Sequence, residues 1–219
     1  MAIRDNIERL KKQVPAGVTI IAVSKTHPVD LIMEAHTAGH RVFGENKAQE
    51  MQKKHEQLPA DIEWHMIGHM QTNKVKYIAP FVRLIHSVDS LHLLQEIDKR
   101  AKQNERVIDC LLQIFIASEE TKFGFSFDEA ERLLASDELK SLEHVRITGL
   151  MGMATNTRDE NRIRGEFHGL KGFFDHLRTA HPGLDILSMG MSSDYRIAIE
   201  EGSTMIRVGS LIFGSRSYE

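Results

Sequence analysis

Short apolar segments alternate with amphipathic stretches along this 219-residue chain, and that alternation constrains the fold more than any other feature. Most of the apolar segments are rich in β-branched residues or apolar on both faces, which is typical of strands buried in a parallel sheet. The candidate strands are residues 18–24, 41–43, 62–67, 83–88, 108–116, 145–151, 184–189 and 204–208. Eight strands alternating with helices predict an α/β fold, a (β/α)8 TIM barrel, with an open doubly wound sheet as the alternative.

The segments between the strands carry helix start signals. Ser126 with Glu129 fits a capping box, and Asp5 with Glu8 is predicted to cap a helix ahead of the first strand. The longest expected helix covers residues 159–180 and has one apolar stripe. That stripe consists of Phe167, Leu170, Phe174 and Leu177. Because no Pro/Ser-rich linker or repeat divides the chain, we expect one domain over residues 1–219.

Charge and composition limit the partners. The formal net charge is -3, so nothing indicates nucleic acid or an anionic membrane as a ligand. A lone cysteine, Cys110, leaves no internal disulfide and no cysteine-based zinc site, and we expect it to be buried and inert. No apolar run approaches the ~18 residues of a membrane span, and the N-terminus carries no signal region, so we expect a soluble, cytoplasmic protein.

In a TIM barrel the functional groups lie just past the C-terminal ends of the strands. The residues at those positions are polar and rich in glycine, as a ligand-binding mouth requires. They are residues 25, 44–46, 68–69, 89–90, 119–122, 190–193 and 209–210.

Lys25 is the most informative of these residues because it directly follows the first apolar strand. A lysine amine that is partly desolvated in a barrel mouth can lose its proton and attack a carbonyl carbon, forming a Schiff base. Two simpler interpretations stay open. Lys25 could extend to solvent from the strand end, or it could form an ion pair with Glu45.

The last two strand ends have the composition of a phosphate site. Ser192 and Ser193 precede one short helix, and Gly209 and Ser210 begin another. Backbone N–H groups at such turns, with serine hydroxyls beside them, bind phosphate oxygens in many TIM barrels. The serines could equally be plain helix caps.

Arg207 is expected to point into the same mouth, two residues before Gly209. Because an arginine keeps its proton, it suits a ring nitrogen that must stay unprotonated. Its alternative is an ion pair with Glu200 or Glu201.

The histidine pairs carry little functional signal. His65 and His69 have i,i+4 spacing, but they fall on a strand and its exit, so a metal site is not expected there. His36 and His40 straddle a helix stop and are expected on the surface. No dinucleotide or P-loop glycine motif is present, and the segment around Ser192 lacks the final glycine of a hydrolase nucleophile elbow.

Several segments in order along the chain match one known family. They are Ala22-Val-Ser-Lys25-Thr, Phe43-Gly-Glu-Asn46, Trp64-His-Met-Ile-Gly-His-Met-Gln-Thr-Asn-Lys74, Glu120-Thr-Lys-Phe-Gly124, Gly149-Leu-Met151, Leu187-Ser-Met-Gly-Met-Ser192-Ser-Asp194 and the segment at residues 202–214. Together they resemble the pyridoxal phosphate homeostasis protein family, relatives of the alanine racemase N-terminal barrel. The sequence departs from the usual family pattern at Lys47-Ala48 and in residues 151–154.

The resemblance implies that pyridoxal 5′-phosphate (PLP) is bound as an aldimine on Lys25. It also implies phosphate contacts from Ser192, Gly209 and Ser210, with Arg207 facing the pyridine nitrogen. Asn46 should lie near the cofactor, and no metal and no catalytic residue are expected. Lys122 is a rival for PLP capture.

The expected function is a non-enzymatic one, buffering or delivering PLP and so maintaining vitamin B6 and amino-acid balance. Apo PLP-dependent enzymes are candidate partners, and the protein is expected to be a monomer. The alternative is a PLP-dependent amino-acid racemase or a Schiff-base aldolase using Lys25, and a PLP-independent phosphate-binding barrel comes third. A racemase is disfavoured because the chain ends after the last barrel helix, without the further domain that supplies the second base in the racemases.

Overall fold

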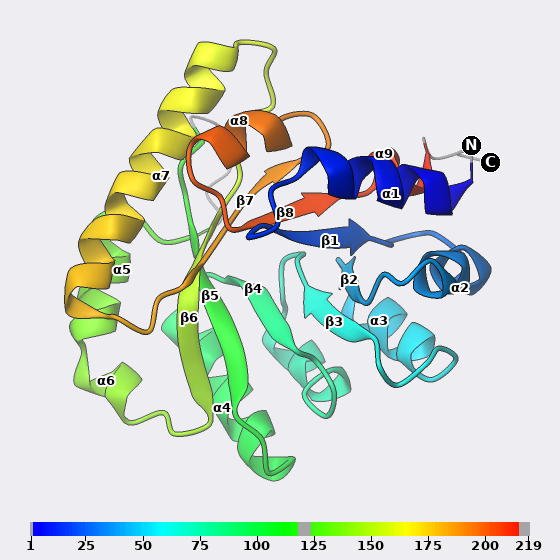
Figure 1. Ribbon diagram of the computed structural model, residues 1–219. Helices are drawn as coiled ribbons and strands as arrows, with labels where there is room; N and C mark the ends of the chain where they lie inside the picture. Colours follow the sequence, from blue (N-terminus) through cyan, green and yellow to red (C-terminus); the bar gives the residue numbers. More distant parts are fainter. Residues whose placement is uncertain (1, 118–123, 215–219) are drawn as a thin grey trace.

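The computed structural model describes residues 2–117 and 124–214, and Figure 1 shows its strands gathered at the centre with helices around them. The strands are β1 Thr19–Val23, β2 Val42–Glu45, β3 Glu63–Met66, β4 Leu84–Val88, β5 Ile108–Ile114, β6 Val145–Gly152, β7 Ile186–Met191 and β8 Met205–Val208. The helices are α1 Ile3–Gln13, α2 Val29–Thr37, α3 Ala48–His55, α4 Leu91–Gln103, α5 Phe127–Ala135, α6 Asp137–Lys140, α7 Glu160–Ala180, α8 Tyr195–Glu200 and α9 Ser210–Phe213, with a 3-10 helix η1 at Thr72–Tyr77.

The eight strands form a closed parallel barrel in chain order. Each strand pairs with the next, and β8 pairs with β1, where Ile21 lies opposite Arg207. The predicted (β/α)8 barrel is therefore confirmed, and the open doubly wound sheet is wrong. The segment predicted as the second strand is β2, which runs two residues further than expected, to Glu45.

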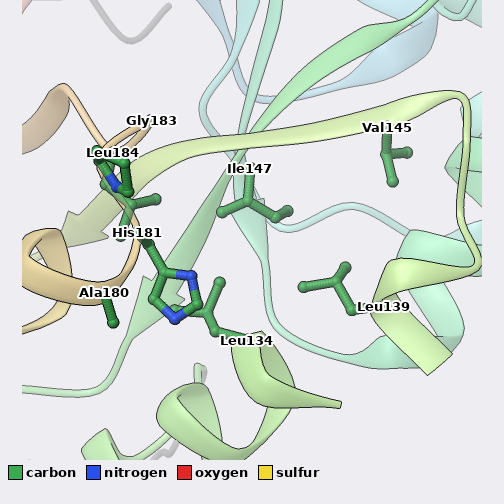
Figure 2. A pocket seen from close by; sticks show the side chains of 9 residues that line it. Leu134, Leu139, Val145, Ile147, Ala180, His181, Gly183 and Leu184 are labelled. Carbon is green, nitrogen blue, oxygen red and sulfur yellow. The ribbon is translucent and has the colours of Figure 1, made fainter. Parts of the chain in front are cut away.

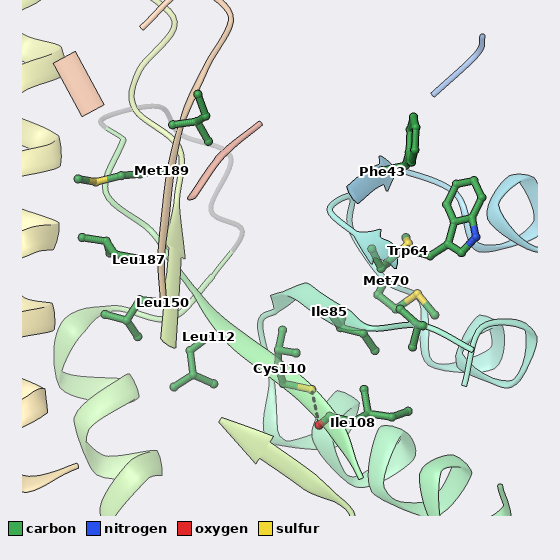
Figure 3. Close-up of a cluster of buried hydrophobic side chains, with 14 of the residues drawn as sticks. Phe43, Trp64, Met70, Ile85, Ile108, Cys110, Leu112, Leu150, Leu187 and Met189 are labelled. Carbon is green, nitrogen blue, oxygen red and sulfur yellow. Dashed lines mark hydrogen bonds between the residues drawn. The ribbon is translucent and has the colours of Figure 1, made fainter. Parts of the chain in front are cut away.

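The larger part of the core lies between the strands and the surrounding helices. Figure 3 shows Leu112, Leu150 and Leu187 pointing away from the barrel, toward the helices outside it. The predicted stripe of α7 packs against such residues, and its four members are all buried. Cys110 is fully buried, and burial raises the pKa of its thiol, as expected of an inert cysteine.

A second, smaller apolar cluster lies inside the barrel. It comprises Ile21, Leu84, Leu111, Met151 and Met205. The barrel is thus a packed core rather than a pore, as is usual for eight strands.

Some local predictions hold and others fail. The capping box of Ser126 and Glu129 is formed at the start of α5. Asp5 does not cap α1, which begins at Ile3. The Ile3 N–H donates to Glu34 Oε1 of α2 at 3.0 Å, so a carboxylate distant in sequence satisfies the helix start.

His40 is another correction, because its side chain is buried rather than on the surface, with Nε2 2.8 Å from the carbonyl oxygen of Val42. Within residues 2–117 and 124–214 no helix combines the length and the apolar character needed to cross a bilayer.

Candidate functional site

The main candidate site is a cavity of about 620 Å³ at the C-terminal ends of the strands. All six of the predicted site residues line it: Lys25, Asn46, Ser192, Arg207, Gly209 and Ser210. The other lining residues are Val23, His27, Ile67, Met153, Met191, Ser193 and Gly214. The volume lies within the usual range for a small-molecule site.

Strand alternation explains why these residues meet. Side chains two apart on a strand share a face, so Lys25 continues the inner face that Ile21 begins. Arg207 and Gly209 likewise continue the inner face of Met205. This rule also accounts for Ile67 and Met153, which the sequence analysis missed and which two-residue counting along β3 and β6 would have found.

The backbone on both sides of Lys25 is held by a network from α3. Lys54 Nζ donates to the Ser24 carbonyl oxygen at 2.8 Å and to Glu50 Oε1 at 2.7 Å. The same Glu50 oxygen accepts the Thr26 N–H at 2.6 Å. Thr26 has φ = 66°, a left-handed conformation that a β-branched residue rarely adopts. The network therefore fixes a strained turn directly after Lys25.

Glu45 belongs to this network and not to an ion pair with Lys25. Its Oε1 lies 2.7 Å from Lys54 Nζ and accepts from Ser24 Oγ at 2.6 Å. The Glu45 carboxylate is fully buried, and burial raises its pKa, against the opposing charge of Lys54. Glu45 thus lies behind the cavity wall, while the Lys25 side chain lines the cavity.

Arg207 is a buried cation at the cavity floor. Its side chain is 4% exposed, and burial lowers its pKa to about 10, so it is still charged at neutral pH. Nη1 donates to the carbonyl oxygen and to Oγ of Ser188, and Nη2 donates to the Gly152 carbonyl oxygen. Among the described residues, no carboxylate lies within ion-pair distance of it. The alternative pairing with Glu200 or Glu201 is wrong, because both contact Arg164.

A buried guanidinium that lines a cavity and forms no ion pair with a described residue, although the charge of Asp194 acts on it, indicates a ligand site. Burial of a charge is costly unless hydrogen bonds or an opposite charge compensate for it. The three contacts described above use three of the five N–H donors of an arginine side chain. The remaining donors make no hydrogen bond to a described residue, and Arg207 lines the cavity.

The loops after β7 and β8 are tied together beside the cavity. Gly209 N–H donates to Ser192 Oγ at 3.2 Å. Gly190, near the end of β7, has φ = 97°, and a Cβ there would lie 2.5 Å from Ala198 Cβ of α8. Glycine is therefore required at this position, both for the backbone conformation and for the close approach of β7 to α8. Asp194 then accepts the Met191 N–H at 2.5 Å and closes the turn. Hydroxyl and backbone donors are thereby concentrated at one side of the cavity.

A second cavity of about 330 Å³ lies elsewhere, at the N-terminal ends of β6 and β7. Figure 2 shows mostly aliphatic side chains around it, among them Leu134, Leu139 and Ile147. His181 is its one ionisable lining residue. It offers no set of polar groups comparable to that around Lys25, so we assign the functional site to the larger cavity.

Two other sequence predictions concern this region. Lys122 lies outside the described residues. In residues 2–117 and 124–214 no group of three or more potential metal ligands occurs. His65 contacts His86 inside the barrel, and His69 pairs with Asp89.

Comparison with known proteins places the chain among relatives of similar length. Residues 1–217 match the model of the alanine racemase N-terminal domain. The pyridoxal phosphate homeostasis protein of Aquifex aeolicus is 42% identical over 201 residues, 91% of this chain and 87% of that protein. The protein of the same name in Escherichia coli is 36% identical over 208 residues, 93% and 88% of the two chains.

Solved structures agree with the fold. PipY of Synechococcus elongatus, solved without PLP, is 36% identical with a TM-score of 0.91, covering 97% of this chain and 100% of that one. A structure of PipY with PLP bound gives a TM-score of 0.87. Alanine racemase of Clostridium difficile has 18% identity and a TM-score of 0.80, which shows the shared fold alone, and the chain spans 57% of its length.

Proposed function

Because the chain belongs to the pyridoxal phosphate homeostasis protein family, whose barrel is the alanine racemase N-terminal domain, we propose that it binds PLP on Lys25. We propose further that it buffers or delivers this cofactor without catalysing a reaction of its own. One observation carries the proposal. An amine, a buried guanidinium that forms no ion pair with a described residue, and a loop rich in hydroxyl and backbone donors line one cavity.

The three groups fit the three functional parts of PLP. When bound, PLP supplies an aldehyde that condenses with a primary amine and a pyridine ring that can act as an electron sink. Lys25 supplies the amine on the inner face of the barrel. Arg207 can donate to a ring nitrogen but does not give up its proton, so that nitrogen stays unprotonated. Ser192, Gly209 and Ser210 are suited to the phosphate, and Asn46 to the edge of the ring.

The proposal that the protein is not an enzyme follows from the groups around the cavity. Racemisation at a Cα requires a base on each face, and Lys25 can serve one face. In the racemases the family resembles, the second base is a tyrosine. Of the tyrosines in the described residues, neither Tyr77 nor Tyr195 lines the cavity, and Tyr195 Oη donates to Gln13 Oε1 at 3.0 Å.

The attachment to Lys25 is tested by reduction and mapping. After loading with PLP, borohydride should make the covalent bond permanent, and peptide mapping should find the pyridoxyl group on the peptide with Lys25. Lys25→Ala should abolish this label, while Lys47→Ala at the exposed rim should keep it. A label found mainly on Lys122 in the unmutated protein would overturn the assignment.

Delivery and catalysis are tested separately. Loaded protein mixed with an apo PLP-dependent enzyme should activate it in the presence of a trap for free PLP. Deuterium exchange at the Cα of L-alanine and other amino acids should stay far below ~1 s⁻¹, the low end of ordinary enzyme turnover. Exchange at that rate or faster, together with loss of optical rotation, would establish the racemase alternative. We further propose a monomeric, cytoplasmic protein that acts as one domain over residues 1–219.

A further inference from the structure

A chain of hydrogen bonds crosses the inside of the barrel behind Arg207. Arg207 Nη1 on β8 donates to Ser188 Oγ on β7 at 2.6 Å. Ser188 Oγ lies 3.0 Å from His86 Nδ1 on β4, and His86 Nε2 lies 3.0 Å from His65 Nδ1 on β3. All four side chains are buried, with 4% exposure at most. The chain therefore joins opposite walls of the barrel through its interior.

The two ends of this chain lie at different ends of the barrel. Arg207 lines the large cavity at the C-terminal ends of the strands. His65 lines a smaller cavity of about 130 Å³ at the N-terminal ends, together with Arg83 and Asp109. Asp109 is paired there with Arg83 at 2.8 Å and with Arg146 at 2.7 Å.

The charge on Arg207 fixes the direction of every bond in the chain. A guanidinium can only donate, so Ser188 Oγ accepts from Arg207. The single O–H of Ser188 then donates to His86 Nδ1, which leaves the His86 proton on Nε2. That proton is donated to His65 Nδ1, so His65 also carries its proton on Nε2. The reverse polarity would leave the buried Ser188 O–H without an acceptor among the described contacts, which is costly.

Burial keeps both imidazoles neutral, as this arrangement requires. Desolvation lowers the pKa of His65 to about 3 and places the pKa of His86 well below its ordinary value. Both ring nitrogens of a protonated imidazole are donors, so it could not accept a hydrogen bond from its neighbour. Protonation of either histidine would therefore break the chain of hydrogen bonds. Neutral Ser188, His86 and His65 add no charge beside Arg207, which stays positively charged, and the carboxylate charge that acts on Arg207 is that of Asp194, which raises its pKa.

We propose that Ser188, His86 and His65 are positioning residues that orient the Arg207 guanidinium toward the ring nitrogen of the cofactor. This inference rests on the proposed function, because it concerns the same cavity. It predicts that a change deep in the barrel, at a residue that does not line the large cavity, alters the electronic state of bound PLP. A residue that only filled space would not have that effect.

The test compares two substitutions of His86 in the full-length protein loaded with PLP labelled with ¹⁵N in the ring. In His86→Gln, the amide can accept from Ser188 and donate to His65, so the direction of the chain is kept. In His86→Leu, the side chain can neither accept nor donate, so the hydrogen bonds to Ser188 and His65 are lost. We expect His86→Leu to shift the ring ¹⁵N resonance and to weaken PLP binding about tenfold, and His86→Gln to restore both. His40→Leu, which removes a buried histidine outside the chain, should leave the resonance unchanged.

A second measurement needs no variant and no cofactor. The imidazole ¹⁵N resonances of the unmutated, PLP-free protein should show His65 and His86 neutral and protonated at Nε2. Ser188→Ala provides a smaller change if His86→Leu does not fold, and it should shift the ring resonance in the same direction.

The outcomes separate the two proposals. If the unmutated protein takes up no PLP, the proposed function fails. If it takes up PLP but the ring resonance is the same in His86→Leu or Ser188→Ala as in the unmutated protein, the positioning inference alone fails. A proton on His86 Nδ1 also overturns that inference.

Discussion

At the scale of single residues, the position of Lys25 depends on Lys54. The Lys54 ammonium contacts the Ser24 carbonyl and the carboxylates of Glu45 and Glu50, and Glu50 in turn holds the Thr26 N–H. Lys54→Met keeps a similar length of side chain but leaves the fully buried Glu45 carboxylate without its cation. Removing one partner of a buried pair costs about 3–5 kcal/mol. We expect the free energy of unfolding at pH 7 to fall by about that amount, as measured in urea.

Lys53→Met is the matched control for this prediction. Lys53 is the preceding residue of α3 and is exposed, so the same change there should alter stability by no more than about 0.5 kcal/mol. We also expect Lys54→Met to slow attachment of PLP to Lys25, because the turn at Thr26 loses its support. Equal effects of the two substitutions would show that the network does not hold the Lys25 turn.

At the scale of elements, the ends of β7 and β8 are expected to determine affinity through the phosphate. Ser192 and Gly209 are linked across these two ends, and each charge-assisted bond to a phosphate contributes about 1.5–3 kcal/mol. Ser192→Ala should therefore weaken PLP binding roughly 10- to 100-fold while the far-UV spectrum is unchanged. Gly209→Val should also weaken it, because a Cβ there already lies 3.2 Å from the Val23 carbonyl oxygen.

The control for the phosphate site is Ser141→Ala, an exposed serine at the end of α6, where no change is expected. Pyridoxal, which has the ring and aldehyde but no phosphate, should bind much more weakly than PLP. Titration of absorbance gives both affinities. Equal affinity for pyridoxal and PLP would contradict a site dominated by these loops.

The helices and strands also show how much of the structure the sequence could predict. Local periodicity was sufficient for the order of strands and helices, and counting by twos along β1 and β8 places Lys25, Arg207 and Gly209 on one inner face. The failures involve partners far away in sequence. The start of α1 depends on Glu34, 31 residues from Ile3, and His86 contacts Ser188 across 102 residues. No local pattern carries such pairs, because closure of the barrel creates them.

At the scale of the whole molecule, buried neutral histidines should make the fold sensitive to mild acid. Burial lowers the pKa of His40 to about 4 and that of His65 to about 3, against an ordinary value of 6.5. Below pH 6.5 the unfolded chain binds protons at these sites while the folded protein does not. Their contribution to stability is therefore complete above pH 6.5 and decreases as the pH falls toward 4 and 3.

The size of the loss follows from the linkage relation. At pH 5, which is 1.5 units below the ordinary value, each of these two histidines costs about 2 kcal/mol, at 1.36 kcal/mol per unit. Burial raises the pKa of the Glu45 and Asp194 carboxyls, so the folded protein takes up their protons at a higher pH than the unfolded chain does. These two groups therefore add stability as the pH falls and offset part of the loss. We expect a net loss of stability between pH 7.5 and pH 5, read from urea unfolding midpoints at several pH values.

His40→Gln isolates one of these contributions. A glutamine amide can still donate to the Val42 carbonyl oxygen, which lies 2.8 Å from His40 Nε2, but it does not titrate. The variant should be somewhat less stable than the unmutated protein at pH 7.5, because it loses the edge-on ring contact with Phe43. It should lose about 2 kcal/mol less between pH 7.5 and pH 5. Stability curves that run parallel over this range would mean that His40 takes up its proton at the same pH in the folded and unfolded states, and would contradict a pKa lowered by burial.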